Sequence, residues 1–362
     1  MLSNTLQLGK QKDIISKASH KLKHIFTMQK KKIKFMHVCG THEQTIAKYG
    51  LRKLLPEGLE VIPGPGCPVC ITPSRDIDIA IELAKTGKTL AVFGDMFRVA
   101  GSEESLADAK AKGCEVIIVY SVSDAVKYAK KHKEKEVVFF SIGLETTAPT
   151  VAFELLNRPP KNFSIIPSNR LTPPVMELLL GMGDFGIDGW ICPGHVSTII
   201  GLEPWRIFPQ VYGMPTVIAG FEPIDVMISI IMLLKQLNDK PKLDNEYARV
   251  VREGGNKKAK ELIRKVFEIK TDEWRGIGNV PQSALKLRKE FKKYDAIDKY
   301  GIETKTSKDF GPGCKCHLVI IGKIKPSDCS LYNKFCKPES PRGPCMVSSE
   351  GSCNIAYRYR YE

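Results

Sequence analysis

The feature that most constrains the fold is a regular alternation of two periodicities between residues 33 and 237. Short apolar runs of the kind found in buried strands occur at 33–38, 59–62, 90–94, 115–120, 136–141, 163–166, 188–192 and 215–220. Between them, apolar residues recur at the three- and four-residue spacing of a one-faced helix, at 74–86, 101–112, 122–131, 173–182 and 223–237. This alternation predicts an α/β fold with parallel sheets covered by helices.

The ends of these expected strands are followed by similar strings in the same order. IKFMHV-CGTHEQT resembles VVFFSI-GLETTAPT, EVIP-GPGCPVC resembles GWIC-PGHVSTIIG, and LAVFG-DMFRV resembles TVIAG-FEPIDV. The three matches predict two similar α/β lobes, at 30–130 and 131–235. The alternative interpretation is that glycine and proline recur at strand-to-helix turns in any such fold.

The two ends of the chain differ from this central part. Residues 1–29 are expected to form a basic N-terminal helix, because nine lysines against one aspartate before residue 35 contribute +8 of the net charge of +15. Residues 236–362 form a third expected domain, with charged helices at 244–268 and 281–294 followed by Cys-dense coil. Such coil is typical of a small domain that a metal centre holds together.

Composition and pattern exclude several classes of protein. Hydrophobic residues make up 43% of the chain, which is enough for real cores, and no 18 apolar residues run together, so no membrane span is expected. No secretory leader pattern is present, and the cytoplasm is the expected compartment. Eleven cysteines in a reducing compartment indicate metal or redox chemistry. The concentration of positive charge in one segment, without a Walker A loop or G-x-G-x-x-G after a strand, argues against nucleic acid and a standard nucleotide site.

The first chemical motif is Cys39-Gly40-Thr41-His42-Glu43, directly after the first expected strand. A thiol and an imidazole are suitable metal ligands, Glu43 is a candidate proton acceptor, and amides at a helix start would favour the thiolate of Cys39. One alternative is a buried cysteine beside a helix whose first turn is capped by Thr41 and Glu43. Another is a Cys-His hydrolytic dyad, for which no orienting third group is evident.

The second motif is GPGCPVC at 64–70, which contains Cys67 and Cys70. Two intervening residues place these thiols where they can form a disulfide or share a metal, and a helix start after them lowers a thiol pKa. A zinc half-site is the competing interpretation, but it needs two more ligands and the chain has no second C-x-x-C. The pattern makes redox activity plausible.

Six further cysteines lie within 40 residues near the C-terminus: Cys314, Cys316, Cys329, Cys336, Cys345 and Cys353. The sequence between them has too little apolar pattern to fold by burial alone, so a cross-link is expected. Zinc or a [4Fe-4S] cluster uses four thiolates. A cluster beside a thiol pair accounts for all six cysteines, whereas zinc leaves two unexplained.

Weaker signals lie at other strand ends. Glu145 and His195 are expected to face the crevice between the lobes, where ligands bind in parallel α/β folds. Either residue could ligate a metal or transfer protons, and either could instead cap a helix or be a hydrogen-bonded polar residue. Segments 95–98 and 272–276 mix charge with aromatic groups, which suits domain contacts as readily as ligand contacts.

Seven strings, in order over nearly the whole chain, resemble the HypD family of hydrogenase maturation proteins: VCGTHEQT, IPGPGCPVC, FFSIGLETTAPT, PGHVSTIIG, AGFEP, EWRGIG and PCMVSSEGSC. Seven matches in order make the resemblance specific, and Leu144, where the family often has Phe, is a conservative difference. The resemblance implies two similar α/β domains, a [4Fe-4S] domain and a role in assembling the Fe(CN)2CO unit of [NiFe]-hydrogenases.

The resemblance also implies roles for individual cysteines. Cys39 would hold the iron jointly with a cysteine of the small partner HypC, with His42 close by. His195 stays a candidate metal ligand because of its position at a strand end. Cys67 and Cys70 would be redox-active. A four-cysteine cluster would lie beside a dithiol, as in ferredoxin:thioredoxin reductase. The expected cluster ligands are Cys314, Cys329, Cys336 and Cys353. The remaining thiol pair is Cys316 and Cys345, and Cys314 and Cys316 could exchange places without disturbing the rest.

Partners follow from the same resemblance. HypC would share the iron, HypE would donate cyanide with HypF acting before it, and the hydrogenase large subunit would be served indirectly. Because cyanide transfer from a thiocyanate-like donor requires electrons, we expect a path from the cluster through Cys316/Cys345 and Cys67/Cys70 to Cys39. A competing function is a thiol-disulfide oxidoreductase acting on a protein disulfide. A zinc-stapled nucleic-acid binder is a third hypothesis, and the absence of an aromatic-basic strand pattern argues against it.

Overall fold

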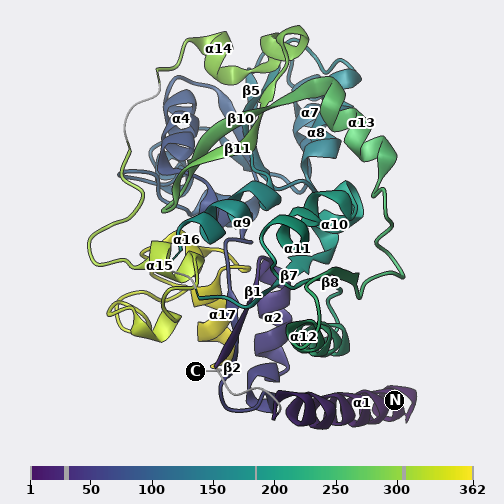
Figure 1. Ribbon diagram of the computed structural model, residues 1–362. Helices are drawn as coiled ribbons and strands as arrows, with labels where there is room; N and C mark the ends of the chain where they lie inside the picture. Colours follow the sequence, from purple (N-terminus) through teal and green to yellow (C-terminus); the bar gives the residue numbers. More distant parts are fainter. Residues whose placement is uncertain (1, 28–31, 184–185, 304–306, 361–362) are drawn as a thin grey trace.

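Two parallel sheets lie at the centres of two α/β lobes, one above the other in Figure 1. The structure is a computed structural model that describes residues 2–27, 32–183, 186–303 and 307–360, with side chains from residue 13 onward. Each of the eight expected strands is present. The predicted α/β class, with parallel sheets and helices packed on them, is confirmed.

Sheet A, in the lower lobe of Figure 1, has the strand order β2-β1-β7-β8-β9 and is parallel throughout. Its strands are β1 (Ile33–His37), β2 (Leu59–Pro63), β7 (Gly189–Pro193), β8 (Thr216–Ala219) and β9 (Leu243–Asn245). One face is covered by α12 (Pro223–Leu237), against which the N-terminal helix α1 (Leu2–Phe26) packs. Leu22 of α1 is fully buried there. The expected basic helix at 1–29 is therefore present, although residues 1 and 28–31 lie outside the described ranges.

Sheet B, in the upper lobe, has the parallel order β4-β3-β5-β6. Its strands are β3 (Thr89–Val92), β4 (Val116–Ile118), β5 (Val137–Gly143) and β6 (Phe163–Asn169). Every residue of β5 and β6 is buried, as expected of parallel strands that are covered on both faces.

The strands are distributed between the sheets differently from the expected lobes of 30–130 and 131–235. Sheet A takes β1 and β2 from the first range and β7 and β8 from the second, while sheet B takes β3 and β4 from the first and β5 and β6 from the second. Between β1 and β9 the chain therefore crosses between the lobes twice. The lobes are still alike, because β2-β1-β7-β8 and β4-β3-β5-β6 place the first to fourth strands of each sheet in the same order. None of the three sequence echoes joins strands at equivalent positions of this order.

Short loops connect the strands to helices that pack around both sheets. Those not yet named, up to the end of sheet A, are α2 (Gly40–Lys48), α3 (Pro68–Ile71), α4 (Ser74–Lys85), α5 (Gly94–Phe97), α6 (Leu106–Ala111), α7 (Val122–Lys131), α8 (Ala148–Leu156), α9 (Thr172–Gly181), α10 (Gly194–Ile200) and α11 (Ile207–Val211). Two 3-10 turns, Leu51–Leu54 and Glu203–Trp205, accompany them.

After sheet A, the predicted helices at 244–268 and 281–294 are largely wrong. α13 (Lys257–Val266) is helical, but β10 (Phe267–Trp274) and β11 (Gly278–Leu287) form an antiparallel hairpin, followed by a 3-10 turn at Lys289–Tyr294. The hairpin packs along β6, with an isolated bridge between Arg170 and Ala284. Pairing with distant strands determines the conformation of this segment, and its charge pattern alone does not reveal that pairing.

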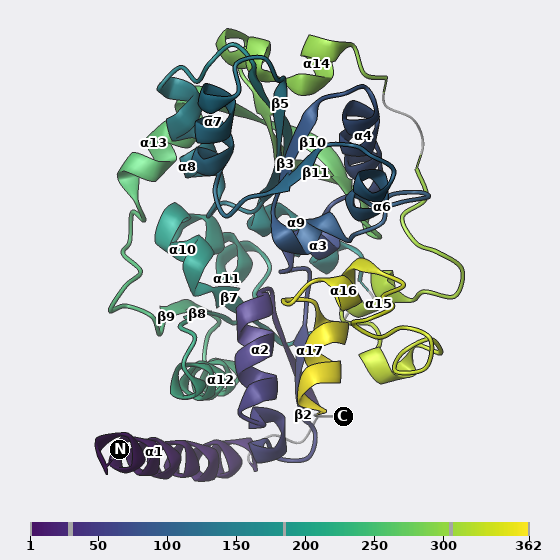
Figure 2. The same cartoon turned by 180° about the vertical axis from the view of Figure 1, so that it is seen from behind.

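The C-terminal segment is coil with short helices, and it contacts both lobes. Its elements are α14 (Ala296–Tyr300), α15 (Cys316–Ile320), a 3-10 turn at Pro326–Asp328, α16 (Pro344–Val347) and α17 (Ser352–Tyr359). α17 packs on α2 of the lower lobe and α16 on α3 (Figure 2). Within the described ranges, no helix combines the length and the apolar composition needed to cross a bilayer.

Candidate functional site

Three segments that are far apart in sequence meet at the start of α2. Cys39 precedes this helix in an extended conformation, and a Cβ on Gly40 would lie 2.6 Å from the Cβ of Glu350. On the other side, a Cβ on Gly66 would lie 2.2 Å from the backbone nitrogen of Cys39. Both positions require glycine, because neighbouring backbone or side-chain atoms fill the space of a side chain. The CGTHE, GPGCPVC and SSEG segments are therefore in contact.

Cys39 is a half-buried free thiol. Burial raises the pKa of its side chain to about 11, and the charge of Glu350 adds to the rise. Hydrogen bonds from the amides of His42 and Thr41 act in the opposite direction but are weaker. The helix-start amides favour the thiolate as expected, but desolvation outweighs them. A cation that binds this sulfur would displace its proton.

The ring of His42 is directed at the loop that follows β8. Its Nε2 donates a hydrogen bond to the carbonyl oxygen of Gly220 at 2.9 Å. Burial, with His37 nearby, lowers the pKa of His42 to about 3, so the ring is neutral. Phe221 stacks on His42 with 4.8 Å between the ring centroids, and His195 stacks on Phe221 at 3.8 Å. A row of three rings thus connects exposed His195 to the buried start of α2.

Arg52 and His37 hold the carboxylate of Glu43. Its carboxylate accepts hydrogen bonds from Arg52 at 2.7 and 3.1 Å and from the Nε2 of His37 at 2.8 Å. Burial alone would raise the pKa of Glu43, but the Arg52 charge and the His37 hydrogen bond together hold it far below its usual range. The predicted role of Glu43 as a proton acceptor is therefore not supported, because so weak a base does not take up a proton at neutral pH. Glu43 anchors α2 to the segment after it.

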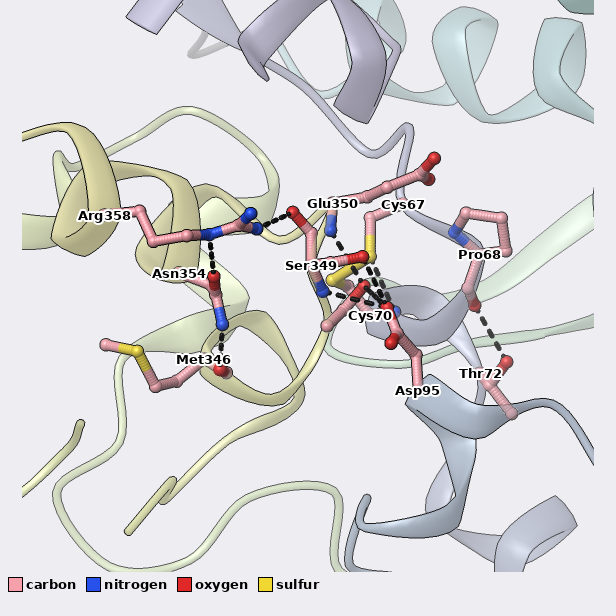
Figure 3. The surroundings of a disulfide bond; sticks show 11 residues. Cys67, Pro68, Cys70, Thr72, Asp95, Met346, Ser349, Glu350, Asn354 and Arg358 are labelled. Atoms are coloured by element: carbon pink, nitrogen blue, oxygen red, sulfur yellow. Dashed lines mark hydrogen bonds between the residues drawn. A yellow bond between two sulfur atoms is a disulfide. The ribbon is translucent and has the colours of Figure 1, made fainter. Parts of the chain in front are cut away.

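Cys67 and Cys70 are joined by a disulfide across α3, with 5.2 Å between their Cα atoms. Of the two interpretations left open by the sequence, disulfide or shared metal, the structure has the disulfide, and the zinc half-site is excluded in this state. Figure 3 shows the backbone of Ser349 and Glu350 beside these sulfurs, with the carboxylate of Glu350 directed away from them. The disulfide therefore faces the C-terminal segment.

A network of hydrogen bonds fixes the loop at 346–351. Asp95, directly after β3, accepts bonds from the Ser349 amide at 2.9 Å and hydroxyl at 2.8 Å, and from the Ser348 hydroxyl at 3.3 Å. Arg358 donates to the Ser349 carbonyl at 2.6 Å (Figure 3). The loop is thus bound to sheet B on one side and to α17 on the other.

The six C-terminal cysteines line one cavity. Val319, Leu331, Tyr332, Gly343 and Met346 complete its wall. All six thiols are free, and neighbouring thiols interact in the order Cys314, Cys316, Cys345, Cys353. A Cβ on Gly343 would lie 2.7 Å from the Sγ of Cys314, so glycine allows the backbone to approach the sulfurs. Sequence reasoning thus selected a set of cysteines that the fold does bring together.

The expected metal ligands Cys39, His42 and His195 do not form a common site. His42 and His195 stack on Phe221, and the ring lies between them. Within the part of the chain that the structure describes, no three His, Cys, Asp or Glu side chains are arranged to hold a metal ion. An iron at Cys39 would therefore need ligands from outside this chain.

Other residues of the site differ in how well the sequence announced them. Glu145 accepts hydrogen bonds from the amide of Thr172 at 2.6 Å and from its hydroxyl at 2.8 Å, which is the helix-capping alternative. Asp95 and Glu350 were not singled out as site residues, although both lie in noted segments. Asp95 directly follows a strand, and Glu350 lies between two cysteines. These positions were the signals available in the sequence.

Comparison with known proteins agrees with the motifs. The sequence model of the HypD family, described as hydrogenase formation hypA family, matches residues 13–360. A hydrogenase expression/formation protein of Methanocaldococcus jannaschii is 49% identical over 333 residues, 91% of this chain and 92% of that protein. Hydrogenase maturation factor HypD2 of Bradyrhizobium diazoefficiens is 43% identical over 343 residues, covering 91% and 90%.

A third relative, hydrogenase maturation factor HypD of Rhizobium leguminosarum bv. viciae, is 44% identical over 338 residues, covering 90% of this chain and 88% of the relative. Identity at this level over nearly complete chains, together with a matching family model, establishes the family. The chain belongs to the HypD family of hydrogenase maturation factors.

Proposed function

We propose that this protein is a scaffold and redox protein for assembly of the Fe(CN)2CO unit of [NiFe]-hydrogenase, acting together with HypC and accepting cyanide that originates from HypE. The observation that carries the proposal is the convergence of three sulfur sites on the loop at 346–351. Glu350 of this loop lies beside Cys39, its backbone lies beside the Cys67–Cys70 disulfide, and cysteines of the cavity flank it on both sides.

The donor atoms of the cavity suit a [4Fe-4S] cluster as resident cofactor by their chemistry, although no three of the thiols are arranged in the described chain to hold a metal ion. Six thiols share a mainly apolar wall, which suits a soft iron-sulfur centre and offers no carboxylate to a hard cation. Burial raises the pKa of Cys316 well above its usual value, and a neighbouring thiol with burial does the same for Cys314. Packing protonated thiols together has little structural benefit, whereas iron that binds them would release the protons.

The ligand set follows the predicted partition. Cys314, Cys329, Cys336 and Cys353 would hold the cluster. Cys316 and Cys345, whose side chains interact, would form the neighbouring thiol pair. When bound, the cluster supplies single electrons at low potential. The contact of α16, which carries Cys345, with α3 supports a short route from this pair to Cys67 and Cys70.

The iron that carries cyanide and carbonyl ligands is the cargo. A thiolate is a soft ligand that suits such iron, and Cys39 is placed to provide one. Because the described part of this chain has no complete ligand set around Cys39, a cysteine of HypC is the natural second ligand. The neutral His42 and the anchored Glu43 hold the first turn of α2 in position.

Transfer of cyanide from a thiocyanate requires two electrons. The thiocyanate S–C bond breaks, cyanide leaves with the electron pair, and the donor sulfur becomes a thiol. If Cys67 and Cys70 are reduced, their two sulfurs form the disulfide, one of their protons goes to the donor sulfur and one goes to solvent. The disulfide between Cys67 and Cys70 is the state that this step would leave. Electrons from the cavity would then regenerate the dithiol.

The remaining partners and the compartment follow from this chemistry. HypF would act before HypE, and the hydrogenase large subunit would receive the iron after HypC. The cytoplasm is the proposed location, because free thiols and a cycling disulfide need a reducing compartment.

A second candidate is a thiol-disulfide oxidoreductase similar to ferredoxin:thioredoxin reductase. The contact between α3 and α16 favours it as well, because it places a disulfide near a candidate cluster. Iron analysis separates the two functions. About four irons per chain favour the reductase, whereas an additional iron with cyanide and carbonyl stretching bands favours the scaffold.

The decisive experiment is co-purification with HypC, followed by infrared and Mössbauer spectroscopy. Wild-type complex should show cyanide and carbonyl bands and an iron distinct from the cluster. Cys39→Ala should lose both while keeping the cluster spectrum. Cys67→Ser with Cys70→Ser should keep the cluster absorbance and lose the cyanide bands. Cys114→Ala, at a half-buried free cysteine outside the site, is the matched control. Bands that persist in the Cys67/Cys70 variant would overturn the electron route.

A further inference from the structure

An open groove lies against the outer wall of the cysteine cavity, and Tyr332 belongs to both. The groove has a volume of about 720 Å³ and is lined by residues between Ser327 and Lys334 and by the end of α17. The cavity is lined by the same Tyr332, together with its neighbours in the chain Cys329 and Cys336. Tyr332 is therefore a common wall between the surface of the molecule and the six thiols.

Hydrogen bonds within the loop hold this wall in place. The amide of Tyr332 donates to the carbonyl oxygen of Cys329 at 2.9 Å, and the amide of Cys336 donates to the carbonyl oxygen of Leu331 at 2.8 Å. The backbone thus closes on itself between the two cysteines. Lys334 and Phe335, at the tip of this loop, are both exposed, and 66% of Phe335 is accessible to solvent.

The surface around the groove is strongly basic. Residues 307–360 contain nine Lys and Arg side chains against four Asp and Glu, and eight of the nine but only two of the four are exposed. Lys334 and Arg360 line the groove itself. Ser327 connects it to a second groove, of about 600 Å³, which is lined by four lysines. A partner with negative charge is therefore attracted to this face.

We propose that the groove at Tyr332 is the docking site of a small acidic one-electron carrier protein, which passes electrons through this wall into the cavity. The inference rests on the proposed function and names the source of the electrons that it needs. Electron transfer slows steeply as more protein separates donor from acceptor, so a donor has to dock where the wall is thin. Complexes of such carriers have small interfaces, and a basic surface around one exposed aromatic side chain, Phe335, suits an acidic carrier.

The electron count requires the carrier to exchange rapidly. Each carrier that docks is oxidised by one electron, and the acceptor in the cavity is reduced by one. Two carriers in succession supply the two electrons that convert the Cys67–Cys70 disulfide to two thiols, and solvent supplies the two protons. Attraction between opposite charges meets this requirement, because it speeds association without a tight interface.

The first test measures binding and does not require electron transfer. The probe is an oxidised, acidic plant-type [2Fe-2S] ferredoxin, whose affinity for the purified full chain is measured by calorimetry at increasing salt. Wild type should bind at low ionic strength and lose affinity as salt screens the charges. Lys334→Glu with Arg360→Glu should bind several-fold more weakly. The matched control is Lys130→Glu with Lys131→Glu, at two exposed lysines of α7 in the upper lobe, which should bind like wild type. Equal affinity in both double variants would overturn the proposal.

The second test measures electron transfer to the iron-loaded full chain. Reduced ferredoxin should reduce wild type and the Lys130/Lys131 variant at the same rate, and the Lys334/Arg360 variant several-fold more slowly. Photoreduced deazaflavin, a small uncharged reductant that needs no docking site, should reduce all three equally. Loss of HypC from the Lys334/Arg360 variant at an unchanged ferredoxin rate would overturn the proposal and assign the groove to HypC. If wild type binds no iron, the proposed function fails, and the affinities of the first test decide whether the groove docks the carrier.

Discussion

The two sulfur sites of this protein are built in opposite ways. Cys67 and Cys70 lie on a short helix at the first crossing between the lobes, and a covalent bond joins them. The C-terminal cysteines are free thiols in coil and short helices, attached to the lobes by the packing of α17 on α2 and α16 on α3 and by hydrogen bonds such as that of Asp95 with Ser349. The fold forms the first site, whereas the second depends on what binds inside it.

The largest expected effect is at the cavity. Cys336→Ala should lose most of the bound iron and loosen the segment at 307–360, because the bound centre cross-links a segment otherwise held by the packing of α17 on α2 and of α16 on α3. Hydrogen exchange measured by mass spectrometry should show fast exchange there and unchanged protection in sheets A and B. Cys192→Ala in the buried strand β7 is the control and should keep its iron. Protection of 307–360 at the wild-type level after iron loss would remove the contrast between the two sites.

The disulfide should matter much less for stability. It closes a loop of sequence separation 3, for which the chain-entropy relation gives about 2 kcal/mol. The double variant Cys67→Ser with Cys70→Ser should therefore lower the free energy of unfolding in urea by about that amount, with an unchanged m-value. A loss of twice this size would mean that the lobes, too, depend on their sulfur site.

Asp95 is the main link between sheet B and the loop that joins the two sites. Asp95→Asn weakens hydrogen bonds that a charged group accepts, and we expect a loss of about 1.5 kcal/mol in the stability of the loop, measured by hydrogen exchange at 346–351. Asp298→Asn, at an exposed pair with Lys292, is the control and should cost less than about 1 kcal/mol. Equal effects of both variants would show that the loop does not depend on sheet B.

The smallest effect concerns Cys39, which lies between the two sites. The pKa of Cys39 is about 11, so little thiolate is present at lower pH. Its alkylation rate should therefore keep rising with pH well beyond 9.0, the ordinary pKa of a cysteine. Glu350→Gln removes a negative charge, lowers the pKa of Cys39 and should speed its alkylation a few-fold at pH 8, since each pKa unit changes the thiolate fraction about tenfold. An alkylation rate that levels off near pH 9 in wild type would contradict the raised pKa of Cys39.

The sequence was sufficient to predict the positions of the strands and which cysteines lie together, because both depend on local patterns. Apolar runs and the C-x-x-C spacing require no knowledge of tertiary contacts. The distribution of strands between sheets could not be predicted, because β1 pairs with β7 across more than a hundred residues of intervening chain. The directions of His42 and Glu43 were also hidden, since Gly220 and Arg52 determine them only after folding.

The two crossings between the lobes bear on the order of events during synthesis. Strands β3 to β6 are continuous in sequence, so sheet B can form as soon as residues 89–169 have left the ribosome. Sheet A can form only later, because β7, the neighbour of β1, is synthesised long after β1 and β2. Cys39 and the pair at 67/70 therefore emerge early but become enclosed last, after the final α17 has docked on α2. A nascent chain therefore exposes these three sulfurs to solvent for most of its translation.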